Sequence, residues 1–137
     1  MNHNHIFVDT NVLIGAYSNR QNDKLCLQYI YSLKGKKLYT STLSIAQLVS
    51  VFQKTKANEE IKTIVRSIIQ KFTVIGFVQN DIEQSMMFIQ SDMEDNIQYV
   101  ISGKMKCFHF VTNNIKDYNN FYNINVLKPQ NIRKINQ

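Results

Sequence analysis

Side chains able to bind metal or transfer protons follow an apolar segment near the start of the chain. Ile6, Phe7 and Val8 run directly into Asp9, and Asn11 stands two residues further on. The three apolar residues predict a short buried strand, and open α/β sheets place their ligand crevices at the carboxyl ends of strands. Asp9 is therefore a candidate for catalysis. The alternative is that Asp9 only caps the following helix.

A second pair of carboxylates, Asp92 and Asp95, stands at the start of a predicted helix. A spacing of three residues puts both side chains on one side of the first turn. Ser91 and Glu94 fit a capping box at the same place, and the helix dipole favours acids in a first turn. Capping could account for this cluster without any catalytic role.

A third polar group, Thr112, Asn114 and Asp117, follows the predicted strand 108–111. In a parallel sheet the three regions can meet in one crevice, where carboxylates repel each other unless they take up protons or a cation. Oxygen ligands of this kind suit Mg²⁺ or Mn²⁺ rather than zinc. Such an ion lowers the pKa of a bound water and stabilises charge on a phosphate oxygen, so the combination points to phosphodiester hydrolysis.

The charge distribution is consistent with a polyanionic partner. The chain of 137 residues carries a net charge of +6, yet five of its ten acids lie between Asp81 and Asp95. A basic protein with an acidic patch is what a metal site facing a nucleic acid requires, because positive charge offsets repulsion of the substrate. The alternative is a solvated basic surface without a partner.

Lys34, Lys36 and Lys37 form a basic turn. We expect this turn to be solvated, and the alternative is that its lysines contact a phosphate.

Length and composition indicate one domain over residues 1–137 in the cytoplasm. An apolar content of 44% supports a globular core. Cys26 and Cys107 follow no metal-ligand spacing and are expected to be reduced. No stretch reaches the roughly 18 apolar residues of a membrane span.

Apolar periodicity predicts an α/β fold in which strands and helices alternate, so the sheet should be mainly parallel and covered on both faces. Met86 and Phe88 are expected in the core, and the chain after Pro129 is expected to be a tail. The predicted strands cover residues 6–8, 38–41, 72–78, 108–111 and 124–127, and the predicted helices cover residues 23–33, 45–52, 58–70, 82–89 and 91–103.

Three segments together resemble the PIN-domain family and its VapC-type toxins: Asp9-Thr10-Asn11-Val12-Leu13, Ser91-Asp92-Met93-Glu94-Asp95-Asn96-Ile97-Gln98 and Val111-Thr112-Asn113-Asn114-Ile115-Lys116-Asp117-Tyr118. The likeness spans nearly the whole chain. It implies a three-layer α/β/α domain and a Mg²⁺- or Mn²⁺-dependent endoribonuclease that cleaves RNA. It also implies a homodimer and a cognate antitoxin that inserts a segment into the active-site groove.

The resemblance also assigns roles to individual residues. It makes Asp9 and Asp95 the principal metal ligands, with Asp92 and Asp117 as further catalytic carboxylates and with Asn114 or Asp117 facing the metal. Gln47 stands where the family pattern has Glu, and Asn114 stands where many relatives are acidic, so metal affinity and rate are both expected to suffer. Residues expected to orient the ligands or the phosphate are Asn11, Ser41, Gln47 and Thr112.

Three functional hypotheses remain open from the sequence. The first is a metal-dependent ribonuclease toxin. The second, motivated by Gln47 and Asn114, is a PIN-like domain with impaired catalysis that binds RNA or protein through the same groove. The third is an unrelated small α/β domain whose acids are only helix caps.

Overall fold

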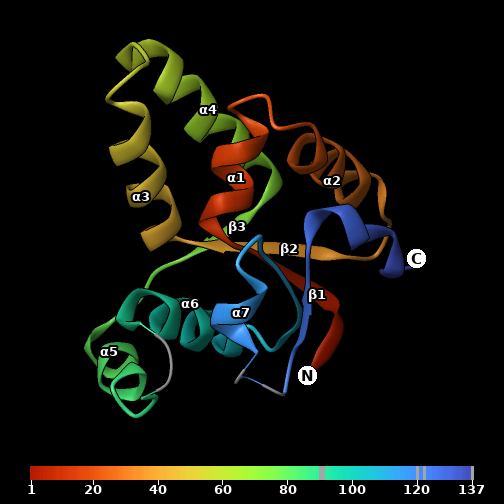
Figure 1. Cartoon of the computed structure of the whole chain (residues 1–137), viewed down its shortest axis with the longest axis vertical. Coiled ribbons are helices and arrows are strands. Elements are labelled where there is room, and N and C mark those ends of the chain that lie inside the picture. The colour runs from red at the N-terminus through yellow and green to blue at the C-terminus, as the bar shows by residue number, and fades with distance from the viewer. Residues whose placement is uncertain (90–91, 120, 122, 137) are drawn as a thin grey trace.

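A computed structural model describes residues 1–89, 92–119, 121 and 123–136 of the chain. Five parallel strands form one sheet in the order β3-β2-β1-β4-β5, with helices on both faces (Figure 1). This arrangement confirms the predicted three-layer α/β/α fold. The strands are β1 (Asn2–Val8), β2 (Lys37–Ser41), β3 (Thr73–Ile75), β4 (Cys107–Val111) and β5 (Asn125–Leu127).

One face of the sheet packs against the N-terminal helices and the C-terminal turn. Because successive side chains of a strand point to opposite faces, Ile6 and Val8 of β1 both enter this layer. They join a core that also contains Leu13, Ile30 and Leu48. The elements of this layer are α1 (Thr10–Ala16), α2 (Gln21–Ser32), α3 (Thr42–Phe52), α4 (Asn58–Lys71) and the 3₁₀ helix η1 (Pro129–Lys134).

The opposite face packs against α6 (Met93–Lys104) and α7 (Ile115–Tyr118), and α5 (Gln79–Ser85) packs against α6. Phe7 of β1 enters this second core, where its ring stacks on that of Phe110 with centroids 5.0 Å apart. Ile101 of α6 and Tyr118 of α7 are completely buried there. Figure 1 shows α5, α6 and α7 together on this side of the sheet.

The strand order places a topological switch point beside the first strand. From β1 the chain proceeds to β2 and β3 on one side, and it later returns to fill β4 and β5 on the other side. In open α/β sheets the crevice at the carboxyl ends of such strands is the usual ligand site. Asp9 follows β1 and Thr112 follows β4, so both stand at this crevice.

Several predicted boundaries were wrong. The first strand begins at Asn2 rather than at residue 6, the helix expected after Asp9 covers Thr10–Ala16, and α7 was not predicted. The expected tail after Pro129 forms η1, whose Ile132 is buried in the first core. The strand predicted over residues 72–78 is limited to Thr73–Ile75.

The prediction of a helix over residues 82–89 with Met86 and Phe88 in the core was also wrong. The helix ends at Ser85, and Met86 and Met87 are 59% and 80% exposed. The cause is that α5 is anchored by polar contacts. Asp81 pairs with Lys104 of α6 at 2.8 Å, and this buried polar face leaves the apolar side chains outward.

Among the described residues, no helix has the length and apolar character needed to cross a membrane. Cys26 and Cys107 are buried, and neither forms a disulfide.

Gly15 offers a test of how α1 and α2 pack. A Cβ built on Gly15 would lie 1.7 Å from Oδ2 of Asp23, which is buried and held by Arg20 at 3.3 Å and by Asn113 at 3.0 Å. We expect Gly15→Ala to lower the free energy of unfolding by about 1–3 kcal/mol, the usual cost of overpacking. The matched control is Gly103→Ala in the last turn of α6, where a Cβ meets no atom within 4 Å. Urea unfolding should show the control equal to or more stable than wild type.

Candidate functional site

Asp9 is both the cap of α1 and the centre of a hydrogen-bond cluster. Its carboxylate is 5% exposed. Oδ1 accepts from the backbone N–H of Thr10 at 2.8 Å and from Nε2 of Gln98 at 3.2 Å. Oδ2 accepts from the hydroxyl of Thr112 at 2.8 Å and from Nδ2 of Asn11 at 3.1 Å. Because a carboxylate offers about four acceptor sites, these donors satisfy it.

Asn11 and Thr112 connect the segment that follows β1 to the segment that follows β4. The Thr112 hydroxyl accepts from Nδ2 of Asn11 at 3.1 Å and from the backbone N–H of Asn114 at 3.0 Å. Oδ1 of Asn11 accepts from the backbone N–H of Asn113 at 2.8 Å. The structure therefore places Asn11 and Thr112 against Asp9, where they fix the position of its carboxylate.

Gln98 is a positioning residue that sequence reasoning missed. It is 2% exposed, and its Nε2 donates to the Ser44 hydroxyl at 2.7 Å as well as to Asp9. Its Oε1 accepts from Ser41 at 2.5 Å. Ser41 is fully buried and caps α3 through the N–H of Ser44. Ser41 thus lies behind Gln98 and outside the cleft lining. The sequence did contain a signal for this role: Gln98 follows Asp95 by three residues, so the two side chains lie on the same side of one helix.

Tyr118 is the second residue that was missed. Its completely buried hydroxyl donates to Oδ1 of Asp95 at 3.1 Å, and its proximity also lowers the pKa of Asp9, which opposes the effect of burial. Burial, followed by the charges of Asp9 and Asp95, raises the pKa of Tyr118, so the hydroxyl stays protonated and remains a donor. Tyr118 therefore joins the two carboxylates that sequence reasoning selected.

The carboxylates line an open cleft of about 440 Å³. Asp92 caps α6, because its side chain accepts from the N–H of Asp95 at 2.8 Å, whereas Ser91 of the proposed capping box lies outside the described residues. Asn114 lines the cleft and Asp117 does not. The lining residues include, besides hydroxyl and apolar side chains, the polar groups of Asp9, Asn11, Gln47, Asp92, Glu94, Asp95 and Asn114.

Gln47 forms a bridge across the cleft. Its Oε1 accepts from the Thr10 hydroxyl at 2.6 Å, and its Nε2 donates to Oε2 of Glu94. Glu94 lines the cleft but was treated in the sequence only as a capping residue. The neutral amide of Gln47 thereby holds a carboxylate from α6 at the cleft wall.

The carboxylates interact electrostatically. Burial raises the pKa of Asp95 to about 7, the charge of Asp92 contributes next, and Asp117 and Asp9 add to the effect. Burial also raises the pKa of Asp9, although its hydrogen-bond donors oppose the shift. None of the described residues that line the cleft is a lysine or arginine. The site therefore holds more negative charge than its own side chains compensate.

The donor set fits a hydrated divalent ion better than a metal enclosed by protein ligands. In the part of the chain that the structure describes, no three His, Cys, Asp or Glu side chains gather closely enough to hold a metal. Mg²⁺ commonly keeps several waters and binds through one or two carboxylates. The groups that could supply such ligands are the carboxylates of Asp9 and Asp95 and the amide oxygen of Asn114, all of which line the cleft. Direct coordination by Asp9 requires that one of its donors be displaced, and the longest of these bonds is that from Gln98.

The fold and the site define the class of this protein, a parallel α/β protein with a carboxylate cleft at the switch point of its sheet. Residues 6–85, which are more than half of the chain, match the family described as PIN domain. The chain belongs to the PIN-domain family. The matched residues include Asp9 and Gln47 but not Asp95 or Tyr118, so the structure alone joins the later half of the site to the earlier half.

Solved structures share the fold at low sequence identity. A toxin–antitoxin complex from Klebsiella pneumoniae is 20% identical with a TM-score of 0.70, and the match covers 90% of this chain and 97% of that chain. VapBC2 from Rickettsia felis, bound to a promoter DNA fragment, is 16% identical with a TM-score of 0.68, and the match covers 90% and 98%. VapC20 from Mycobacterium tuberculosis, a toxin that cleaves the sarcin–ricin loop, is 12% identical with a TM-score of 0.61, and the match covers 77% and 86%. No curated protein matches the sequence.

The raised pKa of Asp95 makes stability depend on pH. Because the folded-state pKa of about 7 exceeds the ordinary value of 3.8, the folded protein binds more protons than the unfolded chain between these values, and stability falls as pH rises through this window. In metal-free buffer at pH 8 we expect Asp95→Asn to raise the free energy of unfolding by about 1 kcal/mol, a figure reduced for the partial exposure of the group.

Thermal unfolding from pH 3.5 to 8.5 measures this difference. The gap between Asp95→Asn and wild type should close at the acid end, where both side chains are neutral. Glu59→Gln is the control: it removes an exposed charge in the first turn of α4, where Glu59 pairs with Lys62 at 3.2 Å, and should change stability only slightly and in the opposite direction. A pH-independent gap for Asp95→Asn would contradict the assignment.

Proposed function

We propose that this protein is a Mg²⁺- or Mn²⁺-dependent endoribonuclease and the toxin of a type II toxin–antitoxin pair. The observation that carries the proposal is the meeting of Asp9, Asp92 and Asp95 in one open cleft at the switch point of the sheet. Four of the solved structures with this fold are described as toxin–antitoxin, VapBC or FitAB assemblies, and a fifth is described as a toxin that cleaves the sarcin–ricin loop. We further propose that the protein forms a homodimer and that an antitoxin covers the cleft.

In this proposal Asp9 and Asp95 hold the ion. A bound Mg²⁺ or Mn²⁺ supplies a water of lowered pKa and stabilises charge on a phosphate oxygen. Thr112 and Asn11 fix the Asp9 carboxylate, and Tyr118 fixes Asp95 through Oδ1. Because the pKa of Asp95 is about 7 before any ion binds, binding of the ion near neutral pH would displace a proton from this carboxylate and would strengthen as pH rises. The net charge of +6 reduces repulsion between the protein and RNA.

A second candidate function is a binding module without nuclease activity. It is favoured by Gln47, whose amide cannot act as a base or offset the charge of a cation, and by the small number of clustered ligands. In this case the same cleft binds RNA or a partner protein but releases no cleavage product.

Cleavage of RNA by the full chain tests the leading proposal. With 5 mM MnCl₂ or MgCl₂ as roughly saturating ion, we expect labelled ribosomal RNA to be cut, and excess EDTA should abolish the reaction. Asp95→Asn should reduce the rate at least about 100-fold, because it removes a carboxylate that holds the ion. Release of labelled fragments on a denaturing gel measures the rate.

Glu59→Gln removes a carboxylate from α4, away from the cleft, and is expected to retain full activity. Cleavage that survives both EDTA and Asp95→Asn would exclude the proposed metal-dependent mechanism. Specific RNA binding without cleavage, under any of the ionic conditions, would favour the binding module instead.

Replacement of Gln47 by Glu tests whether a missing carboxylate limits metal binding. The oxygen that accepts from Thr10 would be kept, while a second negative charge would face Glu94. We expect Gln47→Glu to lower the melting temperature in EDTA and to bind Mn²⁺ about tenfold more tightly, because metal affinity rises with ligand charge. Gln53→Glu makes the same charge change at the exposed C-cap of α3, away from the cleft, and should leave the affinity for Mn²⁺ unchanged. Equal affinities in all three proteins, measured by calorimetry, would show that Gln47 is not the limiting position.

A further inference from the structure

The carboxylate cleft has no basic side chain of its own to hold an RNA backbone. None of the described residues that line it is a lysine or arginine. In nucleic-acid complexes, phosphate groups are held mainly by arginine, lysine and other hydrogen-bond donors, and these contacts fix the register of the strand. A substrate that carries a negative charge at every phosphate therefore needs a basic group at the edge of this cleft.

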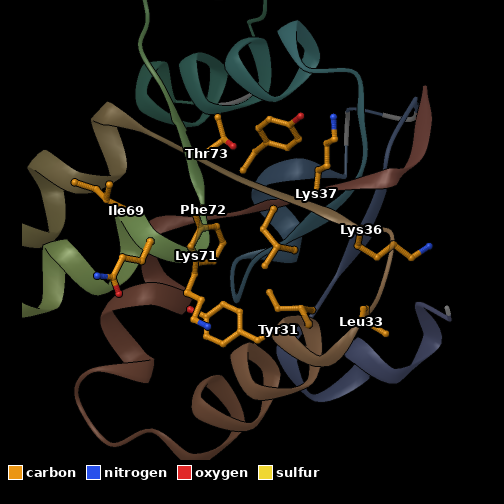
Figure 2. Close-up of a pocket in the computed structure, with 12 residues that line it drawn as sticks. Tyr31, Leu33, Lys36, Lys37, Ile69, Lys71, Phe72 and Thr73 are labelled. Carbon is orange, nitrogen blue, oxygen red and sulfur yellow. The ribbon is translucent and has the colours of Figure 1, made fainter.

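The lysines where β2 and β3 begin do not meet this need. Figure 2 shows Lys37 on the α6 side of the sheet and Lys71 beside Tyr31 on the other side, so their ammonium groups point apart. Strand β2 also runs parallel to β1, so its start lies at the edge of the sheet opposite Asp9. A phosphate contact near the carboxylates must come from another part of the chain.

Arg20 borders the cleft from the turn between α1 and α2. Its Nη2 donates at 3.3 Å to the backbone oxygen of Asn11, a residue that lines the cleft beside Asp9. The backbone N–H of Arg20 donates to the oxygen of Gly15 at 2.9 Å, which fixes the turn. Among the described residues, Arg20 is thus the basic side chain whose hydrogen bonds reach the cleft lining.

A buried acid holds the guanidinium in this position. Nε of Arg20 lies 3.3 Å from Oδ2 of Asp23, which is 2% exposed. Oδ1 of Asp23 accepts from Nδ2 of Asn113 at 3.0 Å, and the backbone N–H of Asn113 donates to Oδ1 of Asn11 at 2.8 Å. These four residues form a closed ring of contacts against the cleft lining. Only glycine fits at position 15, because a Cβ there would lie 2.8 Å from Nε of Arg20.

The competing explanation is that Arg20 only neutralises the buried charge of Asp23. A guanidinium offers five N–H donors, however, and the contacts to Asp23 and Asn11 use two of them. The side chain of Arg20 is 57% exposed, whereas that of Asp23 is 3% exposed. Three donors therefore remain for a ligand at the edge of the cleft.

We propose that Arg20 binds a backbone phosphate of a single-stranded RNA whose neighbouring phosphate lies at the carboxylates. This inference rests on the proposed nuclease function, since it names how the same cleft holds its substrate. Arginine suits the role because its planar fork can donate two hydrogen bonds to one phosphate. Asp23 fixes the guanidinium before the RNA arrives, so less side-chain entropy is lost on binding.

Binding of a fluorescein-labelled RNA dodecamer, measured by anisotropy in EDTA, tests this role apart from cleavage. We expect Arg20→Gln to raise the Kd at least about fivefold at low salt and to reduce the slope of log Kd against log salt by about 0.7, the value for one contact to a single strand. Arg66→Gln is the matched control, because it removes the same charge from an exposed position on α4 outside the cleft lining. It should leave both quantities close to those of wild type.

Removal of the buried acid separates the two explanations. If Arg20 only neutralises Asp23, the double variant Asp23→Asn/Arg20→Gln should bind RNA as wild type does, and that result would overturn the proposal. If Arg20 contacts phosphate, the double variant should bind as weakly as Arg20→Gln, and Asp23→Asn alone should bind at least as tightly as wild type. Circular dichroism and thermal unfolding verify that each variant is folded.

The outcomes also distinguish this inference from the nuclease proposal. Metal-dependent cleavage by wild type, together with equal Kd values for Arg20→Gln and Arg66→Gln, would overturn the role of Arg20 alone. Lower RNA affinity in Arg20→Gln without cleavage by wild type would support the phosphate contact within the binding-module candidate and contradict the nuclease. Absence of RNA binding by the wild-type protein would overturn the role of Arg20 as well.

Discussion

The buried carboxylate of Asp9 is the constraint on which the rest of the site depends. Leaving a buried carboxylate without partners costs several kcal/mol or forces it to become neutral. Here donors from three separate parts of the chain satisfy it: the start of α1, Gln98 of α6 and Thr112 after β4. These bonds can form only when both helix layers and the two central strands are assembled. The same contacts that make the charge tolerable therefore align the walls of the cleft.

The cleft still carries uncompensated negative charge after this alignment. Tyr118 stabilises the charged forms of Asp9 and Asp95, yet both carboxylates keep raised pKa values. Burial outweighs the hydrogen bonds at Asp9, and burial together with neighbouring acids outweighs them at Asp95. Such an arrangement favours protons at low pH and a cation at higher pH. The fold thus holds the acids together at a cost that a divalent ion would offset.

Charge is separated along the strand direction. Acids from the end of β1 and the start of α6 line the cleft at one edge of the sheet, while lysines lie where β2 and β3 begin. Parallel strands allow this separation, because every strand begins at one edge of the sheet and ends at the other. The net charge of +6 accordingly conceals an acidic cleft.

Local sequence determined the strand–helix alternation, the parallel sheet and the position of Asp9 at a strand end. The reason is that the apolar periodicity of an element and the residues that begin and end it depend only on neighbouring residues in the chain. Tertiary structure decided which side chains meet. Only packing brought Gln98 and Tyr118 to the carboxylates, selected Asn114 over Asp117 for the cleft lining, and linked Gln47 to Glu94. It also left Met86 exposed, since polar contacts of α5 outweighed an apolar pattern. Such contacts join residues far apart in the chain, and periodicity reports only which face a residue occupies.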